Sequence, residues 1–122
     1  MDRLLDTDPL GFLIDWLDQS LPAGVHVGDD RADQLPSVVV RADGGAERRI
    51  WTGSAQLGVN VWAATDREAQ ALALEVRSWI EHATQCVECV EASCSLPIEL
   101  VDNSGHPRRY LAATLTLTQR VA

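Results

Sequence analysis

Two long segments in which apolar and polar residues alternate limit the fold of this chain more than any other feature. One runs from Trp51 to Ala63 and the other from Arg109 to Arg120. Successive side chains of a strand point to opposite faces, so each segment predicts a strand with one face against a core. The core-facing residues are Leu57, Val59 and Val61 in the first segment and Leu111, Ala113, Leu115 and Leu117 in the second.

The clearest helix pattern lies between these two segments. Thr65 followed by Glu68 is a capping-box pattern, which predicts where the helix begins. The apolar stripe of this helix comprises Ala69, Leu72, Ala73, Val76, Trp79, Ile80 and Ala83. Leu74 lies almost opposite the stripe, and two interpretations stay open for it: an ordinary exposed leucine, or a packing contact with another subunit.

The rest of the chain completes the order of elements. The remaining segments are a first helix capped by Asp8, strands near 25–27 and 37–41, an extended segment at 87–98, and loops at 43–49 and 101–107. The order is therefore α-β-β-β-α-β-β, with short connections that favour antiparallel neighbours. This order predicts an α+β fold: a mainly antiparallel sheet of about four to five strands, with two helices packed on one face.

Length and charge restrict the class of protein. A chain of 122 residues suits one domain that spans 1–122. The net charge of −8, with arginine as the only type of cation besides histidine, argues against nucleic acid as a tightly bound partner. No apolar run approaches the roughly 20 residues of a membrane span, and the acidic N-terminus is unlike a secretion signal. We therefore expect a protein that forms in a cytoplasm and does not contact a membrane.

Four residues form the strongest candidate for a metal site: His82, Cys86, Cys89 and Cys94. Tetrahedral zinc takes four nitrogen or sulfur ligands, and two of these cysteines have the Cys-x2-Cys spacing. A second ligand pair is missing, and a strand over this segment would place Cys86 and Cys89 on opposite faces. Ordinary reduced thiols are therefore favoured over zinc, and a redox pair is weaker still because it does not open a helix.

Catalytic motifs are missing from the sequence. His26, His82 and His106 stand in no recognisable nucleophile–base arrangement, and no phosphate-binding glycine loop is present. The acidic cluster of Asp29, Asp30 and Asp33 fits a solvated loop better than a cation site. The sequence thus predicts a protein that is not an enzyme and that uses no cofactor.

A glycine-containing loop in the middle of the chain combines two arginines with a tryptophan. Arg48 and Arg49 stand next to Trp51, and both residue types are enriched at the energetic centres of protein interfaces. Trp51 is predicted either to contact another subunit or to pack over the edge of the sheet.

The chain resembles the tail terminator, or tail completion, proteins of long-tailed bacteriophages, especially those of actinobacterial hosts. The resemblance covers nearly the whole chain in short pieces. These are Leu21–Val25, Leu35–Arg41, the following Gly44-Gly45 loop, Val59–Thr65 running into Glu68-Ala69, Leu72-Ala73, Val76-Arg77, Leu96-Pro97, Asp102, Gly105–Tyr110 and the threonine-rich last strand. The Val61–Thr65 strand end before the capped helix and the Gly105–Tyr110 turn carry most weight. The cysteine-rich stretch has no counterpart.

The resemblance implies a structural virion protein that forms a ring, expected to be a hexamer, at the head-proximal end of the tail tube. The ring would end polymerisation of the major tail tube protein and offer a docking surface to the head–tail connector protein. DNA would pass through its lumen only as cargo. In the family the loop between the middle strands orders on assembly, and residues 43–53 match that position.

Three other readings fit the sequence. A head–tail joining protein or a minor tail protein of the same virion region would share these features. A cytosolic α+β ligand-binding domain would be a monomer or dimer with a defined pocket. A small zinc-binding domain would hold metal at the cysteine-rich stretch.

Overall fold

The structure is a computed structural model that describes residues 4–5, 8–30, 33–42, 47–48, 52–101, 104–118 and 120–121. The helices are α1 (Pro9–Ser20), α2 (Asp66–Glu81) and the short 3-10 helix η1 (Ala83–Gln85). The strands are β1 (Leu4–Leu5), β2 (His26–Gly28), β3 (Ser37–Ala42), β4 (Glu47–Arg48), β5 (Thr52–Trp62), β6 (Cys89–Cys94), β7 (Ile98–Leu100), β8 (Arg108–Thr118) and β9 (Arg120–Val121).

The main sheet has the strand order β2-β3-β5-β8-β6, and all its pairs are antiparallel except β2–β3. Two further short strands, β4 and β7, lie in line with longer ones. β4 pairs with β5 beyond the end of β3, and β7 pairs with β8 beyond the end of β6. The main sheet is therefore five strands wide, and its elements follow the predicted order α-β-β-β-α-β-β. Both observations confirm the predicted α+β fold. A separate pairing of β1 with β9, near the two chain ends, was not predicted.

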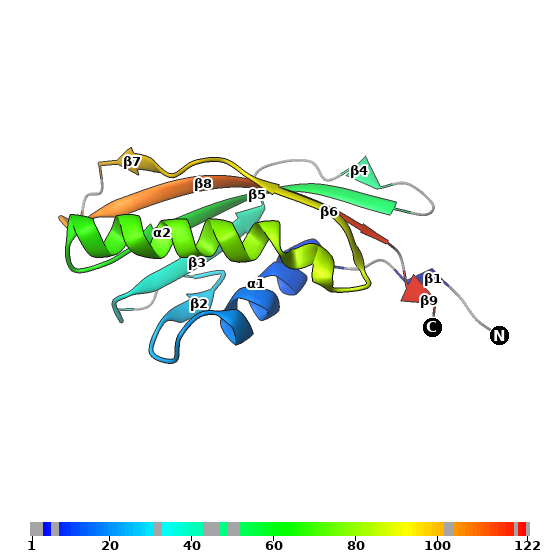
Figure 1. Cartoon of the computed structure of the whole chain (residues 1–122), viewed down its shortest axis with the longest axis horizontal. Helices are drawn as coiled ribbons and strands as arrows, with labels where there is room; N and C mark the ends of the chain where they lie inside the picture. The colour runs from blue at the N-terminus through cyan, green and yellow to red at the C-terminus, as the bar shows by residue number, and fades with distance from the viewer. Residues whose placement is uncertain are drawn as a thin grey trace.

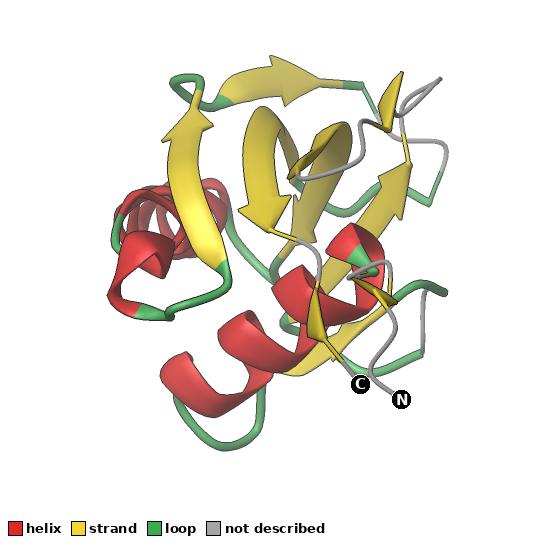
Figure 2. Ribbon diagram, turned by 90° about the vertical axis from the view of Figure 1, so that its right-hand side faces the viewer, coloured by secondary structure: helices red, strands yellow, loops and turns green. Residues whose placement is uncertain are grey.

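Both helices cover the same face of the sheet (Figures 1 and 2). Their buried residues and alternate residues of the central strands form one core. The side chains that alternation assigned to the core are almost completely buried: Leu57, Val59, Val61, Leu111, Ala113, Leu115 and Leu117. The core is thus a single apolar layer between helices and sheet, as the alternation predicts.

Local signals set where both helices begin. The carboxylate of Asp8 accepts a hydrogen bond from the Leu10 N–H at 3.1 Å, and Pro9 occupies the first helical position. Thr65 Oγ1 accepts from the Glu68 N–H at 3.2 Å, as its capping pattern predicts. Neither helix has the length and apolar character needed to cross a bilayer, within the part of the chain that the structure describes.

A pair of tryptophans joins the two helices. Trp16 on α1 and Trp79 on α2 meet edge to face, with ring centroids 6.1 Å apart. Trp16 Nε1 also donates to the backbone carbonyl of Trp79 at 2.7 Å. The indole therefore satisfies its one polar group while it closes the side of the core.

The extended segment predicted at 87–98 is shorter and more irregular than expected. The chain turns after η1, and β6 begins only at Cys89. It then leaves the regular ladder between Cys94 and Ile98 before β7 resumes the pairing with β8. The prediction missed these interruptions because apolar residues occur throughout the segment and hide its breaks.

We predict that truncating the core face of β8 costs far more stability than truncating its other face. Leu115→Ala removes a fully buried side chain and should lower the free energy of unfolding by about 2–5 kcal/mol. Thr114→Ala, one residue away on the half-buried face, should cost about 1 kcal/mol or less. Urea denaturation of both variants measures the difference, and equal losses would contradict the assigned faces.

Candidate interaction surface

Exposed apolar side chains are concentrated along one edge of the sheet. Among the residues whose side chains the structure describes, seven large apolar ones are exposed, and six of these fall within the fifteen residues from 87 to 101. We call these six the apolar edge: Val87, Val90, Leu96, Ile98, Leu100 and Val101. Single exposed apolar residues are ordinary, but a contiguous group on one edge indicates a surface that another molecule covers.

Two bulges hold part of the apolar edge outward. The β6–β8 register shifts at Val90, between the pairs Cys89–Leu117 and Glu91–Thr116. A second shift follows, because β6 and β7 advance four residues from Cys94 to Ile98 while β8 advances three, from Ala113 to Tyr110. An extra residue bends a strand and turns a side chain away from its regular direction. Val90 lies at the first bulge, and Leu96, which is 65% exposed, lies within the second.

The backbone of this edge is poorly suited to bind another strand. Ser95 donates its N–H to the Ala112 carbonyl of β8 at 2.9 Å. Because these groups alternate along an antiparallel strand, the N–H and carbonyl of the neighbouring Cys94 point away from β8. Arg77 of α2 already donates to that Cys94 carbonyl at 3.2 Å. Pro97 has no N–H to offer, and the two bulges break the repeat of outward groups. Partners of the apolar edge therefore have to contact its side chains.

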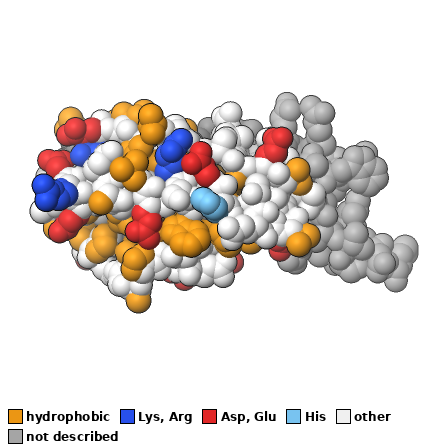
Figure 3. Space-filling view, in the orientation of Figure 1, with side chains coloured by type: hydrophobic (Ala, Val, Ile, Leu, Met, Phe, Trp, Pro, Cys, Tyr) orange, Lys and Arg blue, Asp and Glu red, His pale blue; other side chains and the backbone are white. Residues whose placement is uncertain are grey.

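Leu74 is the seventh exposed apolar residue, at 45% exposure. It lies on the flank of α2 that also carries Gln70 and Arg77, whose side chains reach β8 and β6. In Figure 3 hydrophobic side chains continue from α2 to the strands above it. The predicted off-stripe position of Leu74 agrees with this exposure, while its role as a subunit contact stays a prediction.

The apolar edge continues onto the face of the sheet away from the helices. Ile98 pairs with Tyr110, and Leu100 pairs with Arg108. Arg108 is held in place: its Nε and Nη2 donate to Asn60 Oδ1 at 3.0 and 2.6 Å, and its guanidinium carbon lies 5.3 Å from the Trp62 ring centroid. A fixed arginine over an aromatic ring, next to exposed isoleucine and leucine, has the composition of an interface centre.

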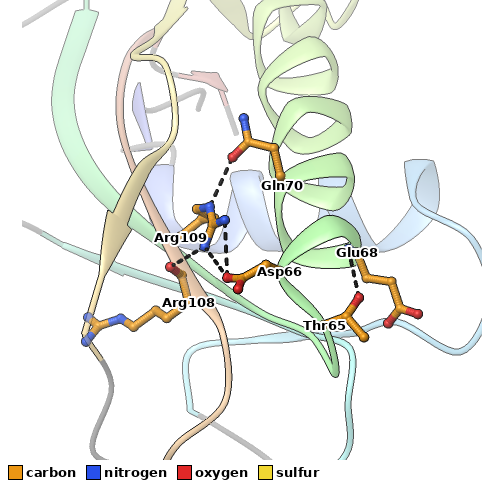
Figure 4. Close-up of polar contacts among 6 residues, drawn as sticks. All are labelled: Thr65, Asp66, Glu68, Gln70, Arg108 and Arg109. Carbon is orange, nitrogen blue, oxygen red and sulfur yellow. Dashed lines mark hydrogen bonds and ion pairs between the residues drawn. The ribbon is translucent and has the colours of Figure 1, made fainter.

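The next residue, Arg109, points to the opposite face and ties α2 to the sheet (Figure 4). Its Nε donates to Gln70 Oε1 at 3.0 Å, and both terminal nitrogens lie 3.4 Å from Asp66 Oδ1. Arg109 is 8% exposed, so this charge is nearly buried and needs these acceptors. The contact fixes the first turns of α2 beside β8 and thereby positions the flank that carries Leu74.

The histidine and cysteines proposed as a weak zinc site have other surroundings. Cys89 and Cys94 are buried and pack in the core, and Cys86 packs against it. His82 Nδ1 hydrogen-bonds to the Ser78 carbonyl at 2.7 Å. No group of three potential ligands lies close enough to hold a metal ion among the residues that the structure describes. Cys86 and Cys89 do not share a strand, the condition under which they would face opposite sides of it: β6 begins only at Cys89, and Cys86 lies in the turn before it, where its carbonyl accepts the Cys89 N–H at 3.1 Å.

The acidic cluster also has a structural partner. Asp30 Oδ1 lies 3.1 Å from Arg41 Nη2, and the Asp30 carbonyl contacts His26 Nε2 at 3.0 Å. These contacts fit the predicted solvated loop. Of the predicted assembly loop, β4 places the backbone of Arg48 beside the beginning of β5. The Arg48 side chain, Arg49 and Trp51 lie outside the described residues.

Comparison with known proteins adds no assignment. No protein-family model matches the chain, and a search of curated proteins gives no significant match.

Burial makes the thiols poor nucleophiles. It raises the pKa of Cys94 from 9.0 to about 12, while nearby Arg77 acts in the opposite direction. Burial also raises the pKa of Cys89 from 9.0 to about 11, and the neighbouring Cys86 and Glu88 add to the increase. The reactive form of cysteine is the thiolate, so both groups are inert near neutral pH.

These shifts predict a loss of stability in alkali. Below pH 9.0 the folded and unfolded chains both keep the thiol protons of Cys89 and Cys94. Above it the unfolded chain loses them first, so the free energy of unfolding should fall as pH rises toward 12, by at most about 1.4 kcal/mol per pH unit and thiol. Urea titrations between pH 8 and 11 measure the slope. The Cys89→Ala, Cys94→Ala double variant should have a shallower slope, and an unchanged slope would contradict the assignment.

Proposed function

We propose that this chain is a structural assembly protein that forms a closed ring at the head-proximal end of a bacteriophage tail tube. In this role it ends growth of the tube and presents a docking surface to the head connector. The proposal joins the family resemblance of the sequence to one observation, the apolar edge. The proposal assigns the chain no catalysis and no cofactor.

The apolar edge supports an assembly role because water-exposed apolar side chains gain free energy when a partner covers them. Each square ångström of apolar surface removed from water contributes about 25 cal/mol. The group lies beside a fixed tryptophan–arginine pair on a rigid sheet, so little conformational freedom is lost on contact. A surface with these properties binds protein more readily than a small polar ligand.

In a closed ring, the same rotation relates each subunit to the next, and the last subunit contacts the first. This occurs when each subunit uses two different surfaces, one for each neighbour. The two edges of the main sheet differ strongly: β6 and β7 form the bulged apolar edge, whereas β2 has only three residues and is followed by the acidic residues Asp29 and Asp30. This asymmetry favours head-to-tail contacts over contacts between identical edges.

The charge of the chain suits a protein through which DNA passes. Thirteen acidic side chains and five arginines lie among the residues whose side chains are described, so this part of the chain has the same net charge as the whole chain, −8. Phosphates are repelled by such a body, so a lumen lined by it would not retain DNA in transit.

We predict that the purified chain forms a discrete oligomer, expected to have six subunits. Native mass spectrometry gives the subunit number, and negative-stain electron microscopy shows whether the particle is an open ring. Replacing Arg48, Arg49 and Trp51 together, by Ala, should leave a folded protein by circular dichroism that remains monomeric. A monomer at every concentration of the unaltered chain would contradict the ring.

The position of the gene separates the tail terminator from the nearest alternatives. A gene between those for head completion and for the major tail tube protein supports the proposal. Coexpression with that tube protein should then give shorter tubes with one capped end. Uncapped tubes, together with binding to the head connector alone, would instead indicate a head–tail joining protein.

A further inference from the structure

We infer that Glu91 of one copy of this chain pairs with Arg108 of the next copy, so that opposite ends of the apolar edge meet. This inference rests on the proposed function and specifies its subunit contact. Each copy uses the β6 end of its apolar edge toward one neighbour and the β7 end toward the other.

Glu91 and Arg108 lie on the face of the sheet away from the helices. Glu91 pairs with Thr116, and Thr116 and Arg108 both alternate with the core residues of β8. Among the described side chains of β5, β6, β7 and β8, these two are the only charged ones on this face. The eight residues of β8 from Arg108 to Thr116 separate them by roughly 27 Å. The two charges therefore cannot pair within one chain.

Arg108 is held in place, and part of its guanidinium is unused. Nε and Nη2 donate to Asn60 Oδ1, and the Trp62 ring lies beside the group. A guanidinium has five N–H groups, so those at its far end remain. In the described part of the chain, no carboxylate pairs with Arg108. Figure 4 shows its side chain extending away from Arg109 and α2. A cation that is already ordered loses little freedom when it binds a carboxylate.

Glu91 supplies the complementary group at the other end of the edge. It is exposed, takes part in no ion pair of the described residues, and stands next to exposed Val90 at the first bulge. Exposed Ile98 and Leu100 lie on the same face beside Arg108. Each end thus combines apolar side chains with one charge, and the two charges have opposite sign. Such surfaces are complementary.

The other described arginines fit Glu91 less well. Three of the five already have a carboxylate partner: Arg41, Arg77 and Arg109. Arg67 is exposed but lies between Asp66 and Glu68 in the first turn of α2, where acidic neighbours oppose the approach of another carboxylate. Arg108 is the one whose surroundings are apolar.

The surface between the two ends favours contact of one end with the other over stacking of two whole faces. Its middle row consists of Gln56, Thr114 and Ser93, which pair across β5, β8 and β6 and are polar and uncharged. Stacked faces would cover this polar row as well, whereas an end-to-end contact covers the apolar ends. Contact between two different ends repeats from copy to copy and can close into a ring.

The test reverses the charge on each side of the contact. Glu91→Arg and Arg108→Glu each set like charges against each other, and each should raise the protein concentration at half assembly by at least about tenfold. An equimolar mixture of the two variants should assemble again with the variants alternating, because every contact then joins opposite charges. Native mass spectrometry counts the copies of each variant, and sedimentation measures the concentration dependence.

Control variants make the same charge changes away from the contact. Glu75→Arg and Arg67→Glu alter exposed positions of α2, which covers the opposite face of the sheet. Both should assemble like the unaltered chain, and circular dichroism checks the fold of every variant.

A double-mutant cycle decides the point even where Arg108→Glu does not fold. Arg108→Gln removes the charge and keeps a side-chain amide beside Trp62, and it should weaken assembly. In that background Glu91→Gln should cost nothing further. Residues this far apart in one chain have additive effects, so loss of additivity indicates contact between copies.

The outcomes distinguish the contact from the function on which it rests. Loss in each charge variant, recovery in the mixture and a non-additive cycle support the contact. Rings that form equally well with Glu91→Arg, losses without recovery in the mixture, or an additive cycle overturn the contact and leave the ring intact. A particle that stops at two subunits overturns both the end-to-end contact and the ring. A chain that is always monomeric overturns the ring itself.

Discussion

The pairing of β5 with β8 is the interaction on which the rest of the structure depends. Eleven consecutive residue pairs join the two strands, from Thr52–Thr118 to Trp62–Arg108. Their shared inner face forms the floor of the core, and both helices pack on it. β3 is added on the outer side of β5, and β6 and β7 on the outer side of β8. The apolar edge therefore takes its position from the register of this central pair.

Signals that act over a few residues made most of this fold predictable. Alternation in β5 and β8 identifies the inner face without knowledge of the partner strand, because a strand has a fixed period of two. The caps at Asp8 and Thr65 are equally local, and both form the predicted hydrogen bonds. The pairing of β1 with β9 was not predictable in this way, since it joins the two ends of the chain and each strand has only two residues.

The candidate surface was only partly predictable, for a physical reason. Leu74 departs from the helical stripe, so its exposure could be inferred from spacing alone. Val90 and Leu96 gave no such sign, because an apolar residue in an extended segment is usually interpreted as part of the core. Their exposure depends on bulges, which arise from the fit of β6 and β7 to β8. The role of Arg109 was hidden for a similar reason: its acceptors, Gln70 and Asp66, lie about forty residues away in the sequence.

The bulged edge links the stability of the single chain to the proposed task of ending a polymer. An open, regular edge strand invites further strands and leads to growth without limit. Here Arg77, Pro97 and two bulges oppose that growth, yet the same irregularities expose apolar side chains. Such an edge does not pass a strand ladder on to another molecule, and in the proposed assembly its contacts would be made by side chains. A protein that terminates an assembly needs this combination, since it must bind firmly on one side without offering a new site for growth.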